Sequence, residues 1–326
     1  MSSIAQAVTL LKAGRLVAFP TETVYGLGAD ATSPEAIARI YKAKGRPSTN
    51  PLIIHVSSIE IARRYVTDWP PIAALLAYHF WPGPLTLILP KNSLIPDIAT
   101  AGLANVAIRV PNHPLALELL NAFAGPLAAP SANRSTHVSP TTAQHVLDEF
   151  PYSAAANEDP GNDPALILDG GECSVGIEST VLDLTTNIPT ILRPGQITPA
   201  DLEPLIGKVQ SRAQVIDASV SAASPGQQET HYAPLTPTFR FETAQRGLIT
   251  PEKHGIVVLS PLHIFKKWGK IIAMPNDPTD YARHLYAVLR ELDEMGLEAI
   301  FVEMPPDEGK WAAIRDRLIR ASRPLR

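Results

Sequence analysis

The segment at residues 16–56, LVAFPTETVYGLGADATSPEAIARIYKAKGRPSTNPLIIHV, sets the expectation for the whole fold. Its apolar start, residues 16–19, predicts a buried strand, and residues 25–30 predict a glycine-containing turn. A serine followed by proline predicts a helix that begins after residue 33, and a glycine followed closely by a proline ends it. Residues 52–56 predict a second buried strand. A strand, turn, helix and strand in this order predict an α/β fold with a pocket at the turn.

Two cations stand at the end of the predicted helix. Lys44 and Arg46 are flanked by Gly45 and Pro47, which place them on a rigid corner rather than on a free helical surface. A guanidinium binds two phosphate oxygens and an ammonium adds a compact charge, so this corner suits a phosphorylated ligand. Two cations on a solvated surface are the alternative explanation. His55, in the second strand, fits either a core histidine or a pocket residue, and it lacks partners at metal-ligand spacing.

Apolar runs and amphipathic segments alternate along the rest of the chain, which predicts an α/β first domain and a smaller second one. Further strands of the first domain are expected at residues 85–89, 105–110, 127–130, 165–169, 179–184 and 190–193, and its other helices at 4–12, 59–65, 72–80, 114–122, 141–150 and 199–206. In the second domain, strands are expected at 255–259, 271–274 and 299–303, and helices at 281–295 and 311–321. This alternation predicts a small parallel sheet with helices on both faces. We therefore predict a first domain at residues 1–207, an aperiodic linker at 208–237 and a second domain at 238–326.

The composition is that of a globular protein without a strong charge. The chain has 326 residues, of which 45% are hydrophobic and 18% charged, and its formal net charge is −4. This balance argues against a protein that coats nucleic acid through bulk charge. The single cysteine, Cys173, excludes an intramolecular disulfide and a multi-cysteine zinc site. No apolar run approaches the roughly 20 residues that span a bilayer, and residues 1–15 lack a signal pattern, so we expect a cytoplasmic protein with no membrane partner.

The glycine pattern at residues 26–31 fits the loose G-x-G-x-x-G/A motif of dinucleotide-binding sites. Such a site also requires an acidic residue about 20 positions later to bind the ribose hydroxyls, and residues 44–50 contain none. We therefore exclude a nicotinamide site. The chain also lacks a Ser-His-Asp order, a Walker A loop and an HExxH sequence.

Four further polar residues lie at or near predicted strand ends. Arg109 lies in an apolar strand, where a charge needs a carboxylate from the protein or from a ligand. Ser131 and Asn133 follow a short strand and fit a polar turn as well as a ligand site. Arg193, followed by proline and glycine, fits a simple strand exit as well as a ligand site.

Taken together, these segments closely resemble the Sua5/YrdC/YciO family. The resembling segments are residues 20–28, 44–56, 81–89, 106–111, 128–133, 176–183 and 192–195. The sequence His-Tyr-Ala-Pro at residues 231–234 is typical of the longer, Sua5-type branch, although residues 227–230 and 309–318 depart from its usual pattern. The resemblance implies a YrdC-like twisted open α/β sheet with a large concave cavity, followed by a smaller Rossmann-like C-terminal Sua5 domain.

The resemblance also implies a nucleotidyl transfer. The family condenses L-threonine, bicarbonate or CO2, and ATP into L-threonylcarbamoyladenylate and releases pyrophosphate. The product feeds the t6A modification of tRNA by a downstream transferase machinery, so tRNA binding is compatible with this step but not required by it. We expect Mg²⁺ to arrive with ATP, held by phosphates and water rather than by protein side chains. A reaction of this kind depends on positioning and charge stabilisation more than on a side-chain nucleophile.

The family's site residues are carried over position by position. The residues implied to be catalytic are Lys44 and Arg46, which would face the triphosphate. The implied ATP-binding residues are Arg46, Asn50, Asn105, Ser131, Asn133, Ser139, Arg193 and Tyr232. The implied L-threonine-binding residues are Thr23, His55, Arg109, Ala129 and Ser179. Within these sets, Arg109 would pair with the carboxylate of threonine, and Tyr232 of the linker would close over the cavity.

Two other functions are weighed against this one. Members of the same fold are proposed to bind double-stranded RNA, but the acidic net charge and the neutral Ser, Thr and Asn residues disfavour that function here. A carbamoyltransferase that uses carbamoyl phosphate is the second alternative, as in hydrogenase-maturation proteins with a related domain. Those proteins carry acylphosphatase and zinc-finger-like regions, which this chain lacks.

Overall fold

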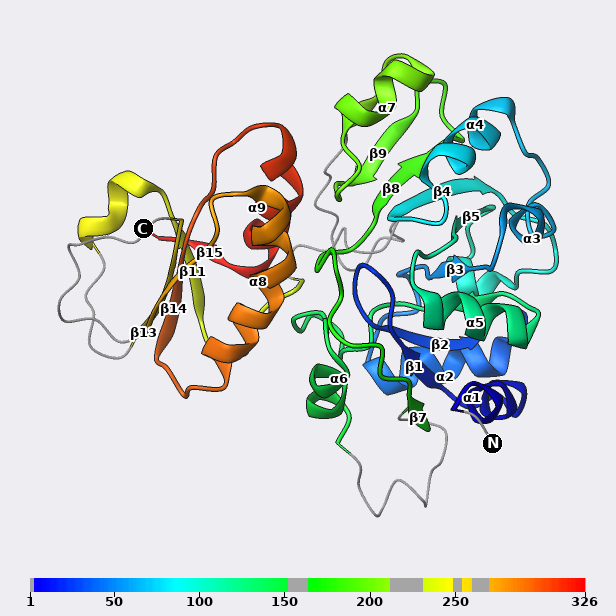
Figure 1. Cartoon of the computed structure of the whole chain (residues 1–326), viewed down its shortest axis with the longest axis horizontal. Coiled ribbons are helices and arrows are strands. Elements are labelled where there is room, and N and C mark those ends of the chain that lie inside the picture. The colour runs from blue at the N-terminus through cyan, green and yellow to red at the C-terminus, as the bar shows by residue number, and fades with distance from the viewer. Residues whose placement is uncertain (1–2, 152–163, 212–230, 249–253, 260–269, 326) are drawn as a thin grey trace.

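The computed structural model describes residues 3–151, 164–211, 231–248, 254–259 and 270–325, and these form two α/β domains, each built on its own sheet (Figure 1). The first sheet ends with β10 at residues 210–211, and the second sheet begins in sequence with β11 at residue 238. Most of the predicted linker, residues 212–230, lies outside the described residues and includes the atypical residues 227–230. Within the described ranges, none of the helices combines the length and the apolarity needed to cross a bilayer.

The first domain is a ten-stranded mixed sheet with helices packed against it. The strand order is β10-β9-β8-β4-β5-β3-β6-β2-β1-β7. The strands are β1 (Val17–Phe19), β2 (Gly26–Asp30), β3 (Ile53–His55), β4 (Leu85–Pro90), β5 (Asn105–Arg109), β6 (Leu127–Ala128), β7 (Leu166–Ile167), β8 (Thr180–Asp183), β9 (Thr190–Arg193) and β10 (Gln210–Ser211). The helices are α1 (Ser3–Lys12), α2 (Pro34–Lys44), α3 (Ile59–Arg63), α4 (Pro71–Phe80), α5 (Pro114–Phe123), α6 (Ala143–Glu149) and α7 (Pro199–Ile206), with a 3₁₀ turn, η1 (Asp97–Thr100).

Helix α2 begins and ends as its sequence predicts. The Ser33 side chain caps its start by accepting a hydrogen bond from the backbone N–H of Ala36, and Pro34 occupies the first position. Gly45 ends the helix with φ of 59°, a left-handed conformation that glycine adopts without a steric penalty. The predicted cationic corner therefore exists, with Lys44 in the last turn and Arg46 just beyond it.

The predicted turn at residues 25–30 is wrong, because Gly26–Asp30 forms strand β2, which pairs antiparallel with β1. The two glycines have a packing role in this pair. A Cβ atom added to Gly28 would lie 2.8 Å from the ring of Phe19, and one added to Gly26 would lie 3.2 Å from Cβ of Ala129. The glycines therefore make room for a buried aromatic ring and for the neighbouring strand, and they do not form a phosphate-binding turn.

The helix predicted at residues 141–150 begins later than expected. Helix α6 starts at Ala143, and its N-cap is Thr142, whose side chain accepts a hydrogen bond from the backbone N–H of His145. Ser139 does not cap a helix. Its side chain is fully buried and donates a hydrogen bond to Glu178 instead.

The second domain contains a five-stranded sheet in which every pairing is parallel, in the order β13-β12-β14-β11-β15. Its elements are β11 (Thr238–Phe241), η3 (Thr243–Leu248), β12 (His254–Val258), β13 (Lys270–Ala273), α8 (Pro278–Asp293), β14 (Ala299–Glu303), η4 (Gly309–Trp311), α9 (Ala312–Ala321) and β15 (Arg323–Pro324). The sequence predicted helices on both faces. Instead, the described helices α8 and α9 lie together on the face that is turned toward the first domain (Figure 1).

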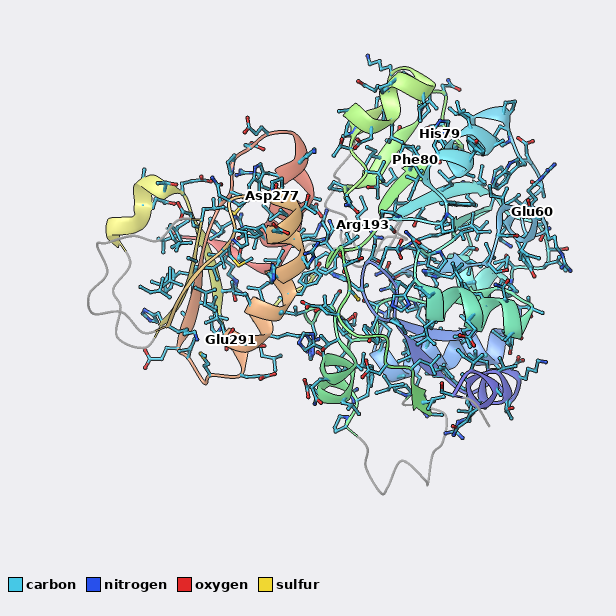
Figure 2. The ribbon with its side chains drawn as sticks, in the orientation of Figure 1. Glu60, His79, Phe80, Arg193, Asp277 and Glu291 are labelled. Atoms are coloured by element: carbon cyan, nitrogen blue, oxygen red, sulfur yellow. The ribbon has the colours of Figure 1, made fainter. Side chains whose placement is uncertain are left out.

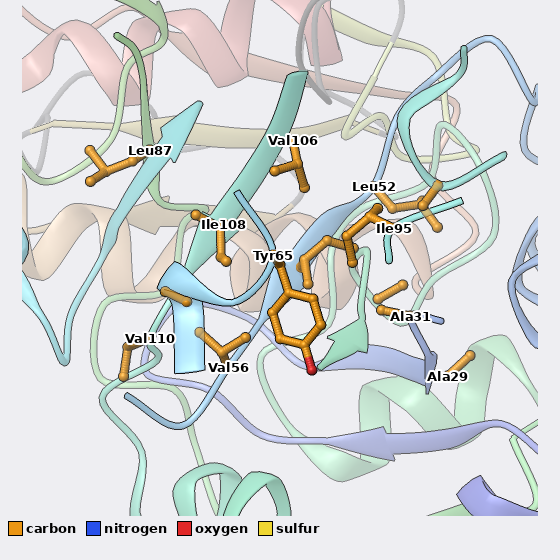
Figure 3. Packing of buried hydrophobic residues seen from close by; sticks show 14 of the residues in the cluster. Ala29, Ala31, Leu52, Val56, Tyr65, Leu87, Ile95, Val106, Ile108 and Val110 are labelled. Carbon is orange, nitrogen blue, oxygen red and sulfur yellow. The ribbon is translucent and has the colours of Figure 1, made fainter. Parts of the chain in front are cut away.

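Two large hydrophobic clusters hold the domains, one inside the first domain and one between the two domains. The first lies within domain one, where residues distant in sequence, such as Ala29, Val56 and Ile108, pack together (Figure 3). The second is shared between the domains, since Val175 and Ile177 of the first domain pack among buried residues of α8, α9 and β14. Helices α8 and α9 thus bury one side on their own sheet and another on the first domain, and the segment that precedes β8 is part of the domain interface.

Candidate active site

A small cavity of about 50 Å³ lies where strand ends of the first sheet meet the segment that leads into the second domain. Nine of the predicted site residues line it, namely Thr23, Arg46, His55, Arg109, Ala129, Ser131, Ser179, Arg193 and Tyr232. Its other lining residues are Thr21, Val24, Gly26, Ile53, Pro130, Glu178 and His231. Arg46 and Arg109, which are far apart in the sequence, therefore face the same hollow.

Arg46 is fixed at this cavity by the loop that follows it. Its Nε donates to the carbonyl of Asn50 at 3.2 Å, and its Nη2 donates to the carbonyl of Pro51 at 3.0 Å. Burial lowers the pKa of the guanidinium to about 10, which still leaves it charged at neutral pH. The Asn50 side chain is buried behind this corner, and none of the described residues forms a hydrogen bond with it.

Lys44 is buried beside the cavity rather than in its wall. Its Nζ donates to the carbonyl of Ser131 at 2.6 Å and also to the carbonyl of Asn133. The Asn133 amide in turn donates to the carbonyls of Arg134 and His137, each at 2.8 Å. Lys44 and Asn133 therefore hold the loop that presents Ser131 to the cavity.

Arg109 and His55 are neighbours in the register of the parallel strands β5 and β3. The Arg109 Nε donates to the carbonyl of Gly83 at 3.1 Å, and its Nη1 donates to the Thr23 hydroxyl at 3.0 Å. Its Nη2 lies 2.7 Å from a carboxylate oxygen of Glu22, an ionic contact whose angles do not make a hydrogen bond. The protein itself thus supplies the carboxylate that a buried strand arginine needs, and Glu22, next to Thr23, was not singled out by the sequence analysis.

His55 presents a neutral imidazole to the cavity wall. Burial, and then the nearby charge of Arg109, lowers its pKa to about 3. Its Nδ1 is buried and has no hydrogen-bond partner in the described part of the chain, and its ring meets the ring of Phe19 edge to face. A neutral ring with a free nitrogen is a hydrogen-bonding group for a ligand rather than a counter-ion.

Glu178, like Glu22, belongs to the site and was not predicted from the sequence. It accepts hydrogen bonds from Ser139 Oγ at 2.6 Å, from Tyr286 Oη at 2.9 Å and from Arg317 Nε at 2.8 Å. Burial alone would raise its pKa, but Arg317 and Arg193 outweigh burial and lower the pKa to about 2. A buried acid at a single sequence position gives no local signal, because its donors come from both domains.

Next to Glu178, Arg193 and Ser179 complete this side of the cavity. Nε and Nη2 of Arg193 donate to the Ser179 carbonyl at 3.1 and 2.9 Å. The Ser179 hydroxyl also hydrogen-bonds the Thr86 hydroxyl at 2.7 Å. Figure 2 shows Arg193 where the two domains meet.

Tyr232 closes the cavity from the segment between the domains. Its backbone is left-handed, with φ of 61°, which is uncommon for a residue other than glycine. Its ring stacks on Tyr286 at a centroid distance of 5.8 Å, and its buried hydroxyl has no hydrogen-bond partner among the residues that the structure describes. A strained backbone and an unpaired buried hydroxyl at a cavity wall are features of a ligand-binding residue.

Five of the predicted site residues do not line the cavity: Lys44, Asn50, Asn105, Asn133 and Ser139. Lys44, Asn50 and Ser139 each hydrogen-bond a lining residue, and Asn133 is bound by Lys44. Asn105 is different, since it begins β5, at the opposite end from Arg109, and its amide lies 3.4 Å from the Thr185 hydroxyl.

Comparison with known proteins places both domains. A family model of Sua5, YciO and YrdC sequences, described as "Telomere recombination", matches residues 9–195. The chain belongs to the Sua5/YrdC/YciO family. A second model, described as "Threonylcarbamoyl-AMP synthase, C-terminal domain", matches residues 197–323, so the chain has the two-domain form of this family.

Relatives within the Sua5/YrdC/YciO family match this chain over nearly its whole length. The threonylcarbamoyl-AMP synthase of Bacillus subtilis is 41% identical, over 98% of this chain and 92% of its own. The threonylcarbamoyl-AMP synthase of Pyrococcus abyssi is 39% identical, over 97% of this chain and 93% of its own. A crystal structure of P. abyssi Sua5 complexed with L-threonine superposes with a TM-score of 0.87 at 36% identity, covering 99% of this chain and 96% of that one.

Proposed function

We propose that this chain is a threonylcarbamoyl-AMP synthase, which uses ATP to convert L-threonine and bicarbonate or CO2 into L-threonylcarbamoyladenylate and pyrophosphate. The observation that carries the proposal is the convergence of Arg46 and Arg109 on one cavity. Two fixed guanidinium groups suit a substrate pair in which one partner carries phosphates and the other a carboxylate. The full-length similarity to threonylcarbamoyl-AMP synthases supports the same conclusion.

L-Threonine is assigned to the side of the cavity formed by β3 and β5. Arg109 would bind the substrate carboxylate, and Thr23, His55, Ala129 and Ser179 would surround the rest of the molecule. Glu22 balances the charge of Arg109 before the substrate arrives. That L-threonine is a ligand of this fold is supported by the L-threonine complex of P. abyssi Sua5.

ATP is assigned to the side formed by Arg46, Ser131, Arg193 and Tyr232. Lys44 would act with Arg46 on the triphosphate or through the loop of Ser131, whose carbonyl it binds. Asn50, Asn133 and Ser139 belong to the layer behind these residues, and their ATP roles stay predictions. Asn105 is left out of the proposed site because it lies at the far end of β5.

The cavity is too small for these substrates as it stands. Pockets for ligands of this size hold roughly 300–1,000 Å³, whereas this one holds about 50 Å³. Since Tyr232 and His231 form part of its wall, we expect the segment that carries them to move outward when ATP enters and to close again over it.

The reaction then needs positioned charge rather than a nucleophilic side chain. The threonine amine takes up CO2 to form a carbamate and loses a proton, and a carbamate oxygen attacks the α-phosphorus while pyrophosphate leaves. Arg46 and Arg193 would stabilise the negative charge that builds up on the phosphates. Mg²⁺ would enter with ATP and neutralise phosphate charge. Glu178 is already bound by three donors, so ATP oxygens and water would supply the ligands of the ion.

Double-stranded RNA binding is not favoured by this geometry. Arg46, Arg109 and Arg193 are at most 8% exposed, so the backbone phosphates of a duplex cannot reach them without opening the site. We also propose that a downstream t6A transferase machinery uses the product, that this step itself does not require tRNA, and that the protein is cytoplasmic.

The test is threonine- and bicarbonate-dependent release of pyrophosphate, with detection of the adenylate product by mass spectrometry. We expect release to require all three substrates and to yield one product with the mass of L-threonylcarbamoyladenylate. ATP-independent binding of RNA without pyrophosphate release would refute the proposal. Turnover with carbamoyl phosphate in place of bicarbonate would instead identify a carbamoyltransferase.

A further inference from the structure

Arg317 is a fully buried side chain of the second domain that reaches across the interface to the wall of the cavity. It lies on α9 with none of its surface exposed, and it is not itself a lining residue. Its Nε donates to the Glu178 carboxylate at 2.8 Å, and its guanidinium carbon lies 5.1 Å from the ring centroid of Tyr232. One side chain thus touches two lining residues, Glu178 of the first domain and Tyr232 of the linker.

The charge of Arg317 is balanced on both sides of the interface. In its own domain, Nη1 donates to the Asp316 carboxylate at 2.8 Å, and in the first domain Glu178 is its ionic partner. A guanidinium that faces two carboxylates and an aromatic ring has its fork and its flat face both occupied. Its orientation is therefore fixed before any substrate binds.

The interface around Arg317 is closely packed, which fixes Glu178 relative to α9. Val175 and Ile177 pack into the second domain's core, and between them Gly176 lies so close to α8 that an added Cβ would stand 2.5 Å from Cα of Arg283. Arg283 Nε also donates to the Ser174 carbonyl at 3.0 Å. The segment that carries Glu178 is thus clamped to α8 immediately before it reaches the cavity.

We propose that Arg317 is a positioning residue for the cavity, holding the Glu178 carboxylate and the Tyr232 ring so that the second domain completes the site. The expected changes in KM and kcat rest on the proposed function, whereas the expected change in hydrogen exchange does not. Because Arg317 acts on the closed position of Tyr232 and does not line the cavity, its loss weakens ATP retention more than it slows the chemistry. Replacement by Met should raise the KM for ATP at least about tenfold, equivalent to about 1.4 kcal/mol, with kcat changed less than about threefold.

A matched control separates positioning from simple docking of the domains. Arg290 of α8 is a second buried arginine that crosses the same interface, where its Nη2 contacts the Glu149 carboxylate at 2.9 Å and the carbonyl of Val138. Neither of those partners lines the cavity. R290M therefore breaks an interdomain ion pair of similar burial and leaves the contacts of Glu178 and Tyr232 in place.

The experiment measures KM and kcat for ATP, and hydrogen exchange of the ligand-free protein over residues 231–236, in wild type, R317M, R317K and R290M. The backbone N–H groups of His231 and Ala233 are bonded to Arg320 and Thr136, so their exchange reports how firmly this segment is held. We expect faster exchange and a raised KM in R317M. R317K, which keeps the charge without the fork and provides a milder variant that preserves the fold, should be intermediate. R290M should keep KM within about twofold of wild type.

Equal changes of KM in R317M and R290M would overturn the proposal in favour of general docking, as would wild-type KM and exchange in R317M. Failure of the proposed function has a different signature. In that case the wild type would release no pyrophosphate, while the exchange difference between R317M and R290M would still be present.

Discussion

Replacing Gly176 with Ala should separate the two domains without touching a side chain of the site. Gly176 has φ of 80°, and its missing Cβ would stand 2.5 Å from Cα of Arg283 and 2.6 Å from the carbonyl oxygen of Ala282. These are backbone atoms of α8, so no side-chain rotation removes the clash. Since carbon atoms pack at about 3.5–4.0 Å, α8 must withdraw by about 1 Å.

That withdrawal breaks the hydrogen bonds that Glu178 receives from the second domain. They measure 2.8 Å from Arg317 and 2.9 Å from Tyr286, and 1 Å more takes both beyond hydrogen-bond range. A hydrogen bond to a charged group contributes about 1.5–3 kcal/mol, and a left-handed alanine costs about 1 kcal/mol. We therefore expect G176A to lower the free energy of unfolding by at least about 4 kcal/mol.

The matched variant is G102A. Gly102 has nearly the same φ, 79°, but apart from its two chain neighbours no described residue has an atom within 4 Å of the position of its missing Cβ. It should therefore lose only the conformational cost of about 1 kcal/mol. Urea unfolding followed by circular dichroism gives both values. We expect calorimetry to show one transition for the wild type, in which the domains unfold together, and two for G176A. Equal losses in the two variants, with one transition in each, would refute the reasoning about the interface.

Three further predictions concern the site. R46M should lower kcat/KM for ATP about 10- to 100-fold, the value of one or more charge-assisted contacts, whereas the exposed Arg63, replaced in the same way, should leave pyrophosphate release unchanged. The pKa of His55 is about 3 in the folded protein and 6.5 in the free residue, so as pH falls from 6.5 toward 3 the unfolded state takes up a proton that the native state does not, and the native state loses stability. In denaturant titrations from pH 7 to pH 4.5, the free energy of unfolding should therefore fall less in H55Q than in wild type. Identical slopes would contradict the assigned burial. Removal of Mg²⁺ by a chelator should abolish pyrophosphate release and leave the melting temperature of the ligand-free protein unchanged, and a fall in that temperature would point to an ion held by the protein itself.

Local sequence features predicted the elements that depend on local interactions. Helix α2 begins at a Ser-Pro pair and ends at Gly45 as expected, because caps and proline act within one helical turn. Strands β3 and β5 were expected from their apolar runs, and His55 and Arg109 within them were recognised as polar residues in buried places. The glycines of β2 locally predict a turn, because nothing in the neighbouring sequence shows that they accommodate the Phe19 ring and Ala129.

The sequence by itself determined most of the helices and strands and their α/β alternation, since periodicity, caps and proline positions are properties of neighbouring residues. Its resemblance to the Sua5/YrdC/YciO family implied nine of the residues that line the cavity. Only the tertiary structure decided which partners these side chains have. It paired Arg109 with Glu22, placed Lys44 behind the Ser131 loop, and brought Arg317 to Glu178 across 139 residues of sequence. Such contacts form where separate elements pack against one another, and a buried charge carries no local mark of the residue that will neutralise it.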